Sequence, residues 1–352
     1  MPAARYHRRH TLADRDQWLA STPERAIEPE LPIIDTHHHL WDFPDDRYSD
    51  VRRYLVPELA ADAAGQNIRQ TVFVETGAFY KNSGPVAFRP TGEVEFAQGQ
   101  AAQGASGDYG DVQVSAGIVG TADLRMGDDV VPVLEALMAA SPQRFRGIRQ
   151  RAAWADTSIF PQPPEWMEER LLASPAFRAG FKYLNRYAMT FDAWVFHPQL
   201  TDVADLAAAF PYTTVILNHL GTPMGIGPYS NDMERAYQEW KTGIAKVAVH
   251  ENVVLKVGGI QMPMNGFAWH LRDTAPTSDE LLATNERYYS YAIEQFGPGR
   301  CLFESNFPVD RQSCSYTVLW NQFKKLTKGY RPDERAAMFH DNALRVYRLV
   351  AH

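Results

Sequence analysis

The chain has 352 residues, of which 45% are hydrophobic and 22% are charged, and its formal net charge is −7 at pH 7. These values are typical of a globular protein, and the negative charge argues against a nucleic-acid partner, which needs a basic surface. No stretch is apolar over the roughly 18 residues of a membrane span, and two cysteines, Cys301 and Cys314, are too few for a disulfide framework, so we expect a cytoplasmic protein without a membrane partner.

Residues 1–30 are expected to form an N-terminal extension ahead of a single large domain, residues 31–352. The extension is basic at Arg5, Arg8 and Arg9 and lacks the apolar core of a signal peptide, so export is not expected. We interpret it as a loosely ordered arm or as a contact surface in a homo-oligomer. The remaining chain is long enough for one α/β barrel, which typically takes roughly 250 residues.

Short apolar strands alternate with longer amphipathic segments along the chain. The expected strands are Leu31 to Asp35, Thr71 to Glu75, Val112 to Val119, Phe145 to Gln150, Ala188 to Val195, Thr213 to Asn218, Val253 to Val257 and Arg300 to Glu304. Helices are expected over Val56 to Gln66, Val94 to Gln103, Val130 to Ala140, Glu165 to Tyr187, Thr201 to Phe210, Asp232 to Val249, Ser278 to Phe296 and within Tyr316 to Val350. Eight strand-helix units predict an α/β (β/α)8 TIM-type barrel rather than a doubly wound sheet, because no Gly-x-Gly-x-x-Gly fingerprint follows a strand.

The first expected strand ends in the sequence LPIIDTHHHLWD, residues 31–42. Side chains alternate along a strand, so His37 and His39 point to one side and His38 to the other. Two imidazoles on one face can converge on a divalent cation or on a substrate oxygen. The alternative is a polar strand end without a ligand. Because active residues of such barrels lie at the C-terminal ends of strands, we expect chemistry here.

Ionisable, aromatic and amide side chains lie at or near the ends of the other expected strands. They are Glu75, Arg149, Arg151, Asp192, Trp194, His197, His219, Lys256, Glu304, Asn306 and Asp310. His219 directly follows a buried strand, and beside His37 and His39 it is expected to act in catalysis or as a ligand. Arg149 and Arg151 share a face, and they either grip a substrate carboxylate or form a salt bridge inside the barrel.

The last expected strand, CLFESNFPVD, places Glu304 and Asn306 on one face, with Glu304 one layer deeper. A buried carboxylate is costly unless it is protonated, hydrogen-bonded or paired with a cation, for which Arg149 and Lys256 are the candidates. Glu304 is therefore interpreted either as a fixed ion-pair partner or as a catalytic residue.

Seven segments occur in the order found in the amidohydrolase superfamily: IIDTHHHLWD, GEVEF, FRGIRQ, FDAWVFHPQL, VILNHLG, VVLKVGGI and FESNFPVD. Over about Pro32 to Val350 the chain resembles its amidohydrolase-related (amidohydrolase 2) branch, which includes 2-pyrone-4,6-dicarboxylate lactonase and fuconolactonase. The resemblance implies a distorted (β/α)8 barrel and hydrolysis of a cyclic ester, with His37, His39, His219 and Asn306 at the central positions. It also implies either no cofactor or one divalent metal, zinc or manganese, with His37, His39 and His219 as the metal ligands.

One motif departs from the family pattern. Where the family has G-S-D-x-P, this chain has Glu304-Ser305-Asn306-Phe307-Pro308, so the aspartate that would activate water is an amide, which cannot accept a proton. Either Glu304 has become the base, or Asp310 or Glu75 reaches the site, or hydrolysis is lost while binding remains, or an inactivating substitution was introduced. The glutamate gained at the family's glycine position favours Glu304.

We therefore expect a hydrolase that opens a lactone or related cyclic ester of a carboxylate-bearing small molecule. The first-strand histidines and His219 would polarise the carbonyl, with Glu304 and Asn306 as further catalytic residues. The expected substrate contacts are Trp41, Glu75, Arg149, Arg151, Trp194 and His197. The alternatives are a metal-dependent decarboxylase of an aromatic or unsaturated acid and a non-catalytic ligand-binding homologue.

Overall fold

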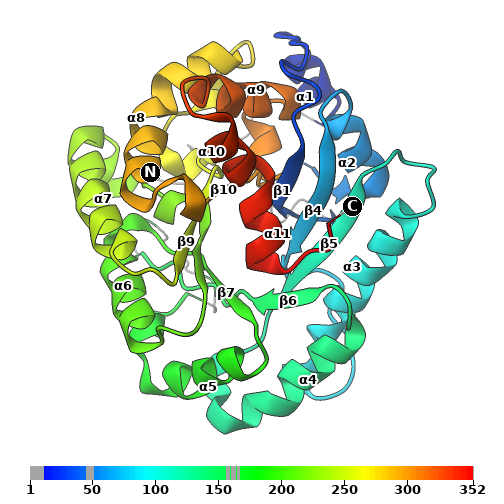
Figure 1. Ribbon diagram of the computed structural model, residues 1–352, viewed down its shortest axis with the longest axis vertical. Coiled ribbons are helices and arrows are strands. Elements are labelled where there is room, and N and C mark those ends of the chain that lie inside the picture. Colours follow the sequence, from blue (N-terminus) through cyan, green and yellow to red (C-terminus); the bar gives the residue numbers. More distant parts are fainter. Residues whose placement is uncertain (1–11, 45–50, 156–158, 160–163, 165–166, 352) are drawn as a thin grey trace.

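The computed structural model describes residues 12–44, 51–155, 159, 164 and 167–351. Eight parallel strands are neighbours in chain order and are surrounded by helices (Figure 1). The strands are β1 (Ile33–His38), β4 (Ile68–Val74), β5 (Gln113–Gly120), β6 (Phe145–Ile148), β7 (Thr190–Ala193), β8 (Val215–Leu217), β9 (Val253–Val257) and β10 (Cys301–Phe303). A short antiparallel pair, β2 (Trp41–Asp42) and β3 (Arg53–Tyr54), follows β1. The predicted TIM-type barrel is confirmed.

The barrel closes between its first and last strands in an irregular way. Beyond β10 the chain runs alongside β1, and the backbone N–H of Asn306 donates to the carbonyl of His37 at 2.8 Å. The N–H of His39 in turn donates to the carbonyl of Phe307 at 2.7 Å. Closure therefore joins the two segments that carry the histidine motif and the departing ESNFP motif.

The surrounding helices, apart from the five-residue helix Pro332–Ala336, bury apolar side chains. They are α2 (Val56–Ala63), α3 (Thr91–Gly104), α4 (Val131–Ala140), α5 (Pro175–Arg186), α6 (Leu200–Ala209), α7 (Met233–Ala248), α8 (Ser278–Phe296), α9 (Tyr316–Leu326), α10 (Pro332–Ala336) and α11 (Asn342–Tyr347). The prediction of one helix over Glu165 to Tyr187 is wrong in its first half. The α5 helix begins at Pro175, because proline fits the first turn and breaks a helix interior. Residues 165 and 166 lie outside the described residues.

The barrel interior is apolar at one end. Ile34, Val72 and Ile216 point inward and pack against Val346 and Tyr347 of the C-terminal helix α11. Figure 1 shows α11 lying across the end of the barrel. Because this helix closes the end from which the strands start, polar side chains that face inward at the other end are left to form the site.

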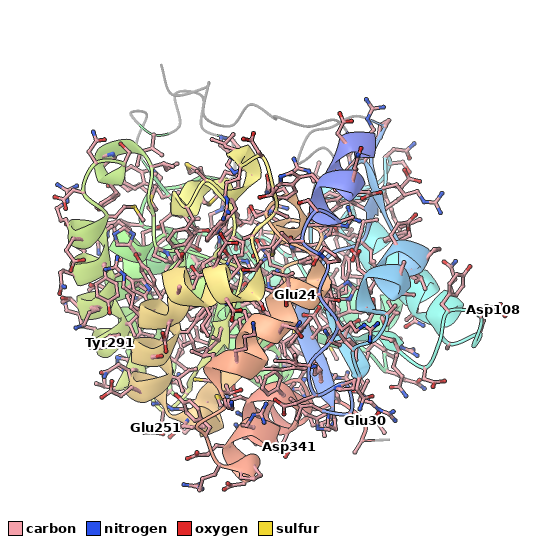
Figure 2. The ribbon with its side chains drawn as sticks, turned by 90° about the horizontal axis from the view of Figure 1, so that it is seen from above. Glu24, Glu30, Asp108, Glu251, Tyr291 and Asp341 are labelled. Carbon is pink, nitrogen blue, oxygen red and sulfur yellow. The ribbon has the colours of Figure 1, made fainter. Side chains whose placement is uncertain are left out.

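The described part of the N-terminal extension packs on the barrel. Helix α1 (Leu12–Leu19) carries Trp18, whose indole N–H donates to the carbonyl of Arg272 at 2.9 Å. Glu24 accepts from the amide of Asn321 on α9 at 2.8 Å and lies beside α8 and α9 (Figure 2). The interpretation as a loosely ordered arm is therefore wrong for this part, while residues 1–11 lie outside the described residues. Among the helices that the structure describes, none is long and apolar enough to cross a membrane.

Candidate active site

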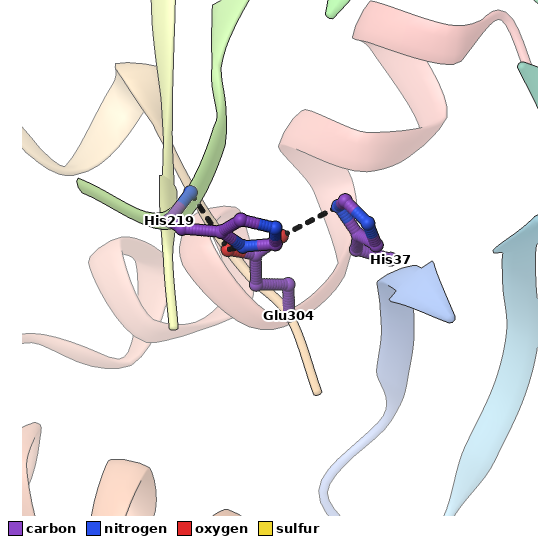
Figure 3. A group of neighbouring side chains, drawn as sticks. All are labelled: His37, His219 and Glu304. Atoms are coloured by element: carbon purple, nitrogen blue, oxygen red, sulfur yellow. Dashed lines mark hydrogen bonds and ion pairs between the residues drawn. The ribbon is translucent and has the colours of Figure 1, made fainter. Parts of the chain in front are cut away.

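Three side chains from three strand ends meet at the C-terminal end of the barrel (Figure 3). The carboxylate of Glu304 lies between two imidazoles, with Oε1 2.7 Å from Nδ1 of His219 and Oε2 2.9 Å from Nδ1 of His37. All three residues are at most 2% exposed. An ionised carboxylate can only accept hydrogen bonds, so the bond between Glu304 and His219 places the proton of the His219 ring on Nδ1. In the neutral ring, Nε2 of His219 then carries no proton and can accept one.

The backbone around His219 is shaped to reach Glu304. Residues His219 and Leu220 both have left-handed backbone conformations, with φ of 53° each, directly after the three-residue strand β8. The turn lets the backbone N–H of His219 donate to Glu304 Oε1 at 3.0 Å while the ring bonds to the same oxygen. Non-glycine residues adopt this conformation at a cost, and such strain is concentrated at functional sites.

Two glycines make room for this arrangement. Gly258 has φ of 155°, and a Cβ there would lie 2.3 Å from the carbonyl oxygen of Glu304. Gly259 has φ of 64°, and a Cβ there would lie 1.9 Å from Nδ1 of His219. The site therefore requires that the backbone after β9 approach Glu304 and His219 more closely than a residue with a Cβ would allow.

Replacing Gly259 by alanine is expected to lower both stability and turnover. The left-handed backbone alone costs an L-residue roughly 1–2 kcal/mol, and the new methyl group would push the His219 ring away from Glu304. We expect kcat to fall about tenfold or more, since a misplaced catalytic group loses its alignment. Urea unfolding and steady-state kinetics measure the two effects. Gly299→Ala is the matched control, because its Cβ would meet nothing within 4 Å; an unchanged kcat in Gly259→Ala would refute the requirement.

His37 faces two cations as well as Glu304. Nη1 of Arg149 lies 3.3 Å from its Nε2, and Nζ of Lys256 lies 3.3 Å from its Nδ1. Burial is the largest cause that holds the pKa of His37 well below its usual value, and the charge of Lys256 adds to it. His37 is therefore a neutral imidazole at neutral pH.

His39 lies beside His37, with ring centroids 4.8 Å apart and the rings nearly perpendicular. Its Nδ1 bonds to the carbonyl of Val74 at 2.8 Å, which fixes the ring and leaves Nε2 as an acceptor. Burial again lowers the pKa well below the usual value. The ring of Trp41 stacks on His39 at 6.0 Å, and its indole N–H donates to the carbonyl of Val51, so Trp41 supports the histidine from behind.

Glu75, Arg149 and Arg151 form one buried cluster at the ends of β4 and β6. Nε of Arg149 is 2.8 Å from Glu75 Oε1, and Nη2 of Arg151 is 3.1 Å from Oε2. Burial alone would raise the pKa of Glu75, but the guanidinium groups of Arg151 and Arg149 together outweigh it and lower that pKa. Of the two predicted alternatives, the salt bridge is present, and two cations against one carboxylate leave one positive charge over.

Trp194 and His197 follow β7 and differ in what they contact. The guanidinium of Arg149 lies 5.9 Å from the centre of the Trp194 ring, a cation–π distance that joins Trp194 to the arginine cluster. His197 accepts from the backbone N–H of Met224 at 3.1 Å and packs against the ring of Tyr229. Burial lowers the pKa of His197 to about 4. The described contacts of His197 therefore anchor the loop after β8.

Asn306 occupies the position of the family's aspartate, with φ of 55°. Its side-chain amide donates to Asp310 Oδ1 at 2.9 Å, and the backbone N–H of Gln261 donates to Oδ2 of the same acid at 3.2 Å. Burial raises the pKa of Asp310 well above its usual value. Asn306 thus joins the end of β10 to a second buried acid instead of presenting a carboxylate of its own.

The predicted cation partners of Glu304, Arg149 and Lys256, are engaged elsewhere. Nζ of Lys256 lies 2.7 Å from Oδ1 of Asp192, which also accepts from the hydroxyl of Tyr347 at 3.2 Å. Of the three alternatives expected for Glu304, hydrogen bonding is the one observed, with the two histidines beside its carboxylate, while Lys256 pairs with Asp192.

A comparison with known proteins gives the family. The amidohydrolase family model matches residues 34–349. The chain belongs to the amidohydrolase family. The match spans nearly the whole barrel and confirms the resemblance that the seven sequence segments indicated.

Individual relatives of this amidohydrolase cover the chain to different extents. An uncharacterized protein of Sinorhizobium fredii is 32% identical over 338 residues, which cover 91% of this chain and 99% of that protein. L-fucono-1,5-lactonase of Burkholderia multivorans is 27% identical over 174 residues, 49% of this chain and 56% of the lactonase. The crystal structure of a Burkholderia multivorans amidohydrolase with bound zinc has a TM-score of 0.68 at 23% identity, covers 90% of this chain and 99% of its own, and shares the fold.

Three side chains of the amidohydrolase could hold a metal ion, judged by their residue types and the distances between them. Ligand atoms of His37, His219 and Glu304 all lie within 4.8 Å of one another, and two histidines with a glutamate are a donor set of catalytic zinc sites. The group contains two of the three predicted ligands, His37 and His219, and has Glu304 where His39 was predicted. The bond between Nδ1 of His39 and the carbonyl of Val74 leaves Nε2 of His39 able to accept a proton or a cation.

The charges around this group are already balanced without a metal ion. Among the described residues of the site, the carboxylates of Glu75, Asp192 and Glu304 are matched in number by Arg149, Arg151 and Lys256, and burial raises the pKa of the two further acids nearby, Asp310 and Glu93. A divalent ion would add two positive charges to a buried and otherwise neutral group, which is costly in a low-dielectric interior. The donor types fit a metal ion, but the charge balance does not require one.

Proposed function

We propose that this amidohydrolase opens a lactone or related cyclic ester that carries a carboxylate. The observation that supports this most is the carboxylate of Glu304 held between His219 and His37 at the barrel mouth. A carboxylate on Nδ1 of a histidine makes Nε2 of that ring a general base, as in triads of unrelated hydrolases. The partial identity with L-fucono-1,5-lactonase supports a cyclic ester as the substrate.

The free, buried Cys301 and Cys314 suit the reducing cytoplasm as the proposed location.

In the proposed reaction, Nε2 of His219 takes a proton from water as the water oxygen bonds to the lactone carbonyl carbon. Glu304 stabilises the imidazolium that forms, because its carboxylate already lies 2.7 Å from Nδ1. The ring C–O bond then breaks, and the proton passes from His219 to the leaving alkoxide. The product is a hydroxy acid.

The arginine side of the site supplies the positive charge. Arg149 and Arg151 with Glu75 keep one positive charge over, which suits a substrate carboxylate and the oxyanion that develops on the carbonyl oxygen. The Arg149 guanidinium is 3.3 Å from His37, so a bound anion would lie next to the histidines. When bound, a metal ion on His37, His219 and Glu304 would supply additional polarisation of the carbonyl.

A panel of lactones with and without a ring carboxylate tests the proposal, with proton release and hydroxy-acid formation as readouts. We expect turnover with a carboxylate-bearing lactone and weaker turnover with its neutral analogue. Release of carbon dioxide from an aromatic or unsaturated acid would instead establish the decarboxylase alternative. Ligands that raise the melting temperature without turnover of any panel member would establish a binding homologue.

Removal of metal is expected to leave activity within about twofold of the starting value, because the charged groups of the site balance without it. The protein is purified, treated with a strong chelator, and checked by elemental analysis before kinetics. A loss of about tenfold or more that zinc or manganese restores would contradict this prediction and assign the three ligands a metal-dependent role.

A further inference from the structure

Glu93 is a buried carboxylate in the first turn of α3, outside the group around His37. It is 1% exposed, and its Oε1 accepts three hydrogen bonds. The donors are the backbone N–H of Thr76 at 2.8 Å, the hydroxyl of Thr76 at 2.9 Å and the backbone N–H of Ala78 at 3.0 Å. Hydrogen bonds from main-chain amides to a carboxylate are among the strong ones, so Glu93 fixes the turn that follows β4.

The turn and the helix are packed without free space. Gly77 has φ of 81° and Phe79 has φ of 55°, so the backbone reverses sharply after Thr76. A Cβ at Gly92 would lie 2.4 Å from the carbonyl oxygen of Phe79. The first turn of α3 therefore lies directly against the turn, which brings the Glu93 carboxylate to the amides of Thr76 and Ala78.

The peptide group between Glu75 and Thr76 is held at both ends. Its N–H donates to Glu93, and its carbonyl accepts from Nη2 of Arg149. The same guanidinium donates through Nε to the Glu75 carboxylate at 2.8 Å and lies 3.3 Å from His37. A peptide group is planar and rigid, so a shift at its N–H moves its carbonyl as well.

We propose that Glu93 is a positioning residue that sets the Arg149 guanidinium through the Glu75–Thr76 peptide and so shapes the anion-binding side of the pocket. The effect on substrate rests on the proposed function, whereas the placement of Arg149 rests on the contacts alone. Without the carboxylate, the Thr76 amide loses its 2.8 Å bond and the Ala78 amide keeps only the longer 3.3 Å bond to the Thr76 hydroxyl, so the turn must move to restore these bonds. The carbonyl of Glu75 then moves away from Arg149.

The pKa of Glu93 shows that its ionised form is destabilised by the surroundings in the folded protein. Burial raises the pKa of Glu93 from its usual 4.5 to about 7, and the negative charge of Glu75 adds to the rise. Because the folded-state pKa is above the unfolded one, ionisation costs stability as the pH rises from about 4.5 through about 7. Glu93→Gln keeps the acceptor oxygen and removes this loss of stability.

The placement is tested by the side-chain Nε–H signal of Arg149 in ¹H–¹⁵N correlation spectra, assigned by its absence in Arg149→Lys. We expect the signal to persist in Glu93→Gln and to shift or broaden in Glu93→Leu. Glu95→Leu is the matched control, since Glu95 lies on the same helix, is exposed and pairs with Lys81 at 2.6 Å. An unchanged Arg149 signal in folded Glu93→Leu overturns the proposal. Should that variant not fold, Glu93→Asp decides in the same way, because it withdraws the carboxylate by one methylene.

The consequence for binding is measured with citrate as a carboxylate probe and with the lactone panel. In Glu93→Leu we expect citrate affinity to fall about tenfold and KM for a carboxylate-bearing lactone to rise about tenfold. The KM of a neutral lactone should stay within about twofold, because that substrate has no carboxylate for Arg149 to bind, whereas kcat should fall to a similar extent for both lactones, because Arg149 also faces the developing oxyanion; a merely destabilised protein would not separate the two KM values. Absence of lactone turnover by the wild type would reject the proposed function and leave the Arg149 signal to decide the role of Glu93.

Discussion

Replacing Glu304 by glutamine is expected to lower kcat at least about a hundredfold on the true substrate, because the loss of a preorganised charge at a reacting group costs about that much. Glutamine has nearly the same shape, but it cannot stabilise an imidazolium on His219. Its amide also places an N–H group where the site has only acceptor oxygens facing Nδ1 of the two histidines. Steady-state kinetics with a proton-release assay measure the change, and thermal unfolding shows whether the fold is kept.

Asp310→Asn is the matched control for Glu304→Gln. Asp310 is also fully buried, and its carboxylate accepts hydrogen bonds from Asn306 and Gln261 rather than from His37 or His219. Its substitution is expected to change kcat less than tenfold, as removal of a group beyond the reacting atoms typically does. A near wild-type rate in Glu304→Gln together with a large loss in Asp310→Asn would transfer the acid-base role to Asp310.

Replacing His219 by alanine is expected to reduce kcat by at least about a hundredfold, since general base catalysis typically contributes that factor or more. The variant removes Nε2, the proposed base, and leaves a cavity beside Gly259, where the ring now fits against the backbone. Imidazole added to the solution should therefore restore part of the turnover in His219→Ala and none in Glu304→Gln.

His38→Asn provides the comparison for His219→Ala. His38 is buried on the same strand as His37 but points to the other side, and its Nε2 lies 2.8 Å from the hydroxyl of Thr71. We expect this variant to lose stability while the folded fraction keeps its kcat. Near wild-type turnover in His219→Ala would remove His219 from the proposed mechanism.

Much of the fold follows from local patterns in the sequence. The bounds of β9 and α8 match the predicted ranges Val253 to Val257 and Ser278 to Phe296, since both are marked by strong periodicity and clear ends. The packing of the N-terminal segment was not predictable in this way. Its contacts, such as Asn321 with Glu24, join residues about 300 positions apart, and no local pattern encodes them.

Because active residues of such barrels lie at the C-terminal ends of strands, the sequence predicted that His37, His219 and Glu304 lie at one end of the barrel. It did not predict that Glu304 contacts both histidines. Pairing depends on the left-handed turn at His219 and on the glycines after β9, which are properties of the backbone in three dimensions. Glu93 received no role from the sequence, although its GEVEF segment was part of the family resemblance. The sequence feature that could have indicated its role is Gly92, directly before Glu93 at the start of α3, because a glycine there allows the helix to approach another segment closely.

The closure of the barrel also has a consequence for how the protein is made. The hydroxyl of Thr36 on β1 donates to the carbonyl of Phe303 on β10, a contact between residues 267 positions apart. The end of the barrel from which the strands start is filled only when α11 packs against inward-facing side chains such as Ile34. Contacts of such long sequence separation form late in folding. During synthesis on the ribosome, β1 and its histidines therefore remain without their final partners until almost the entire chain has emerged, and shortened translation products cannot assemble the site.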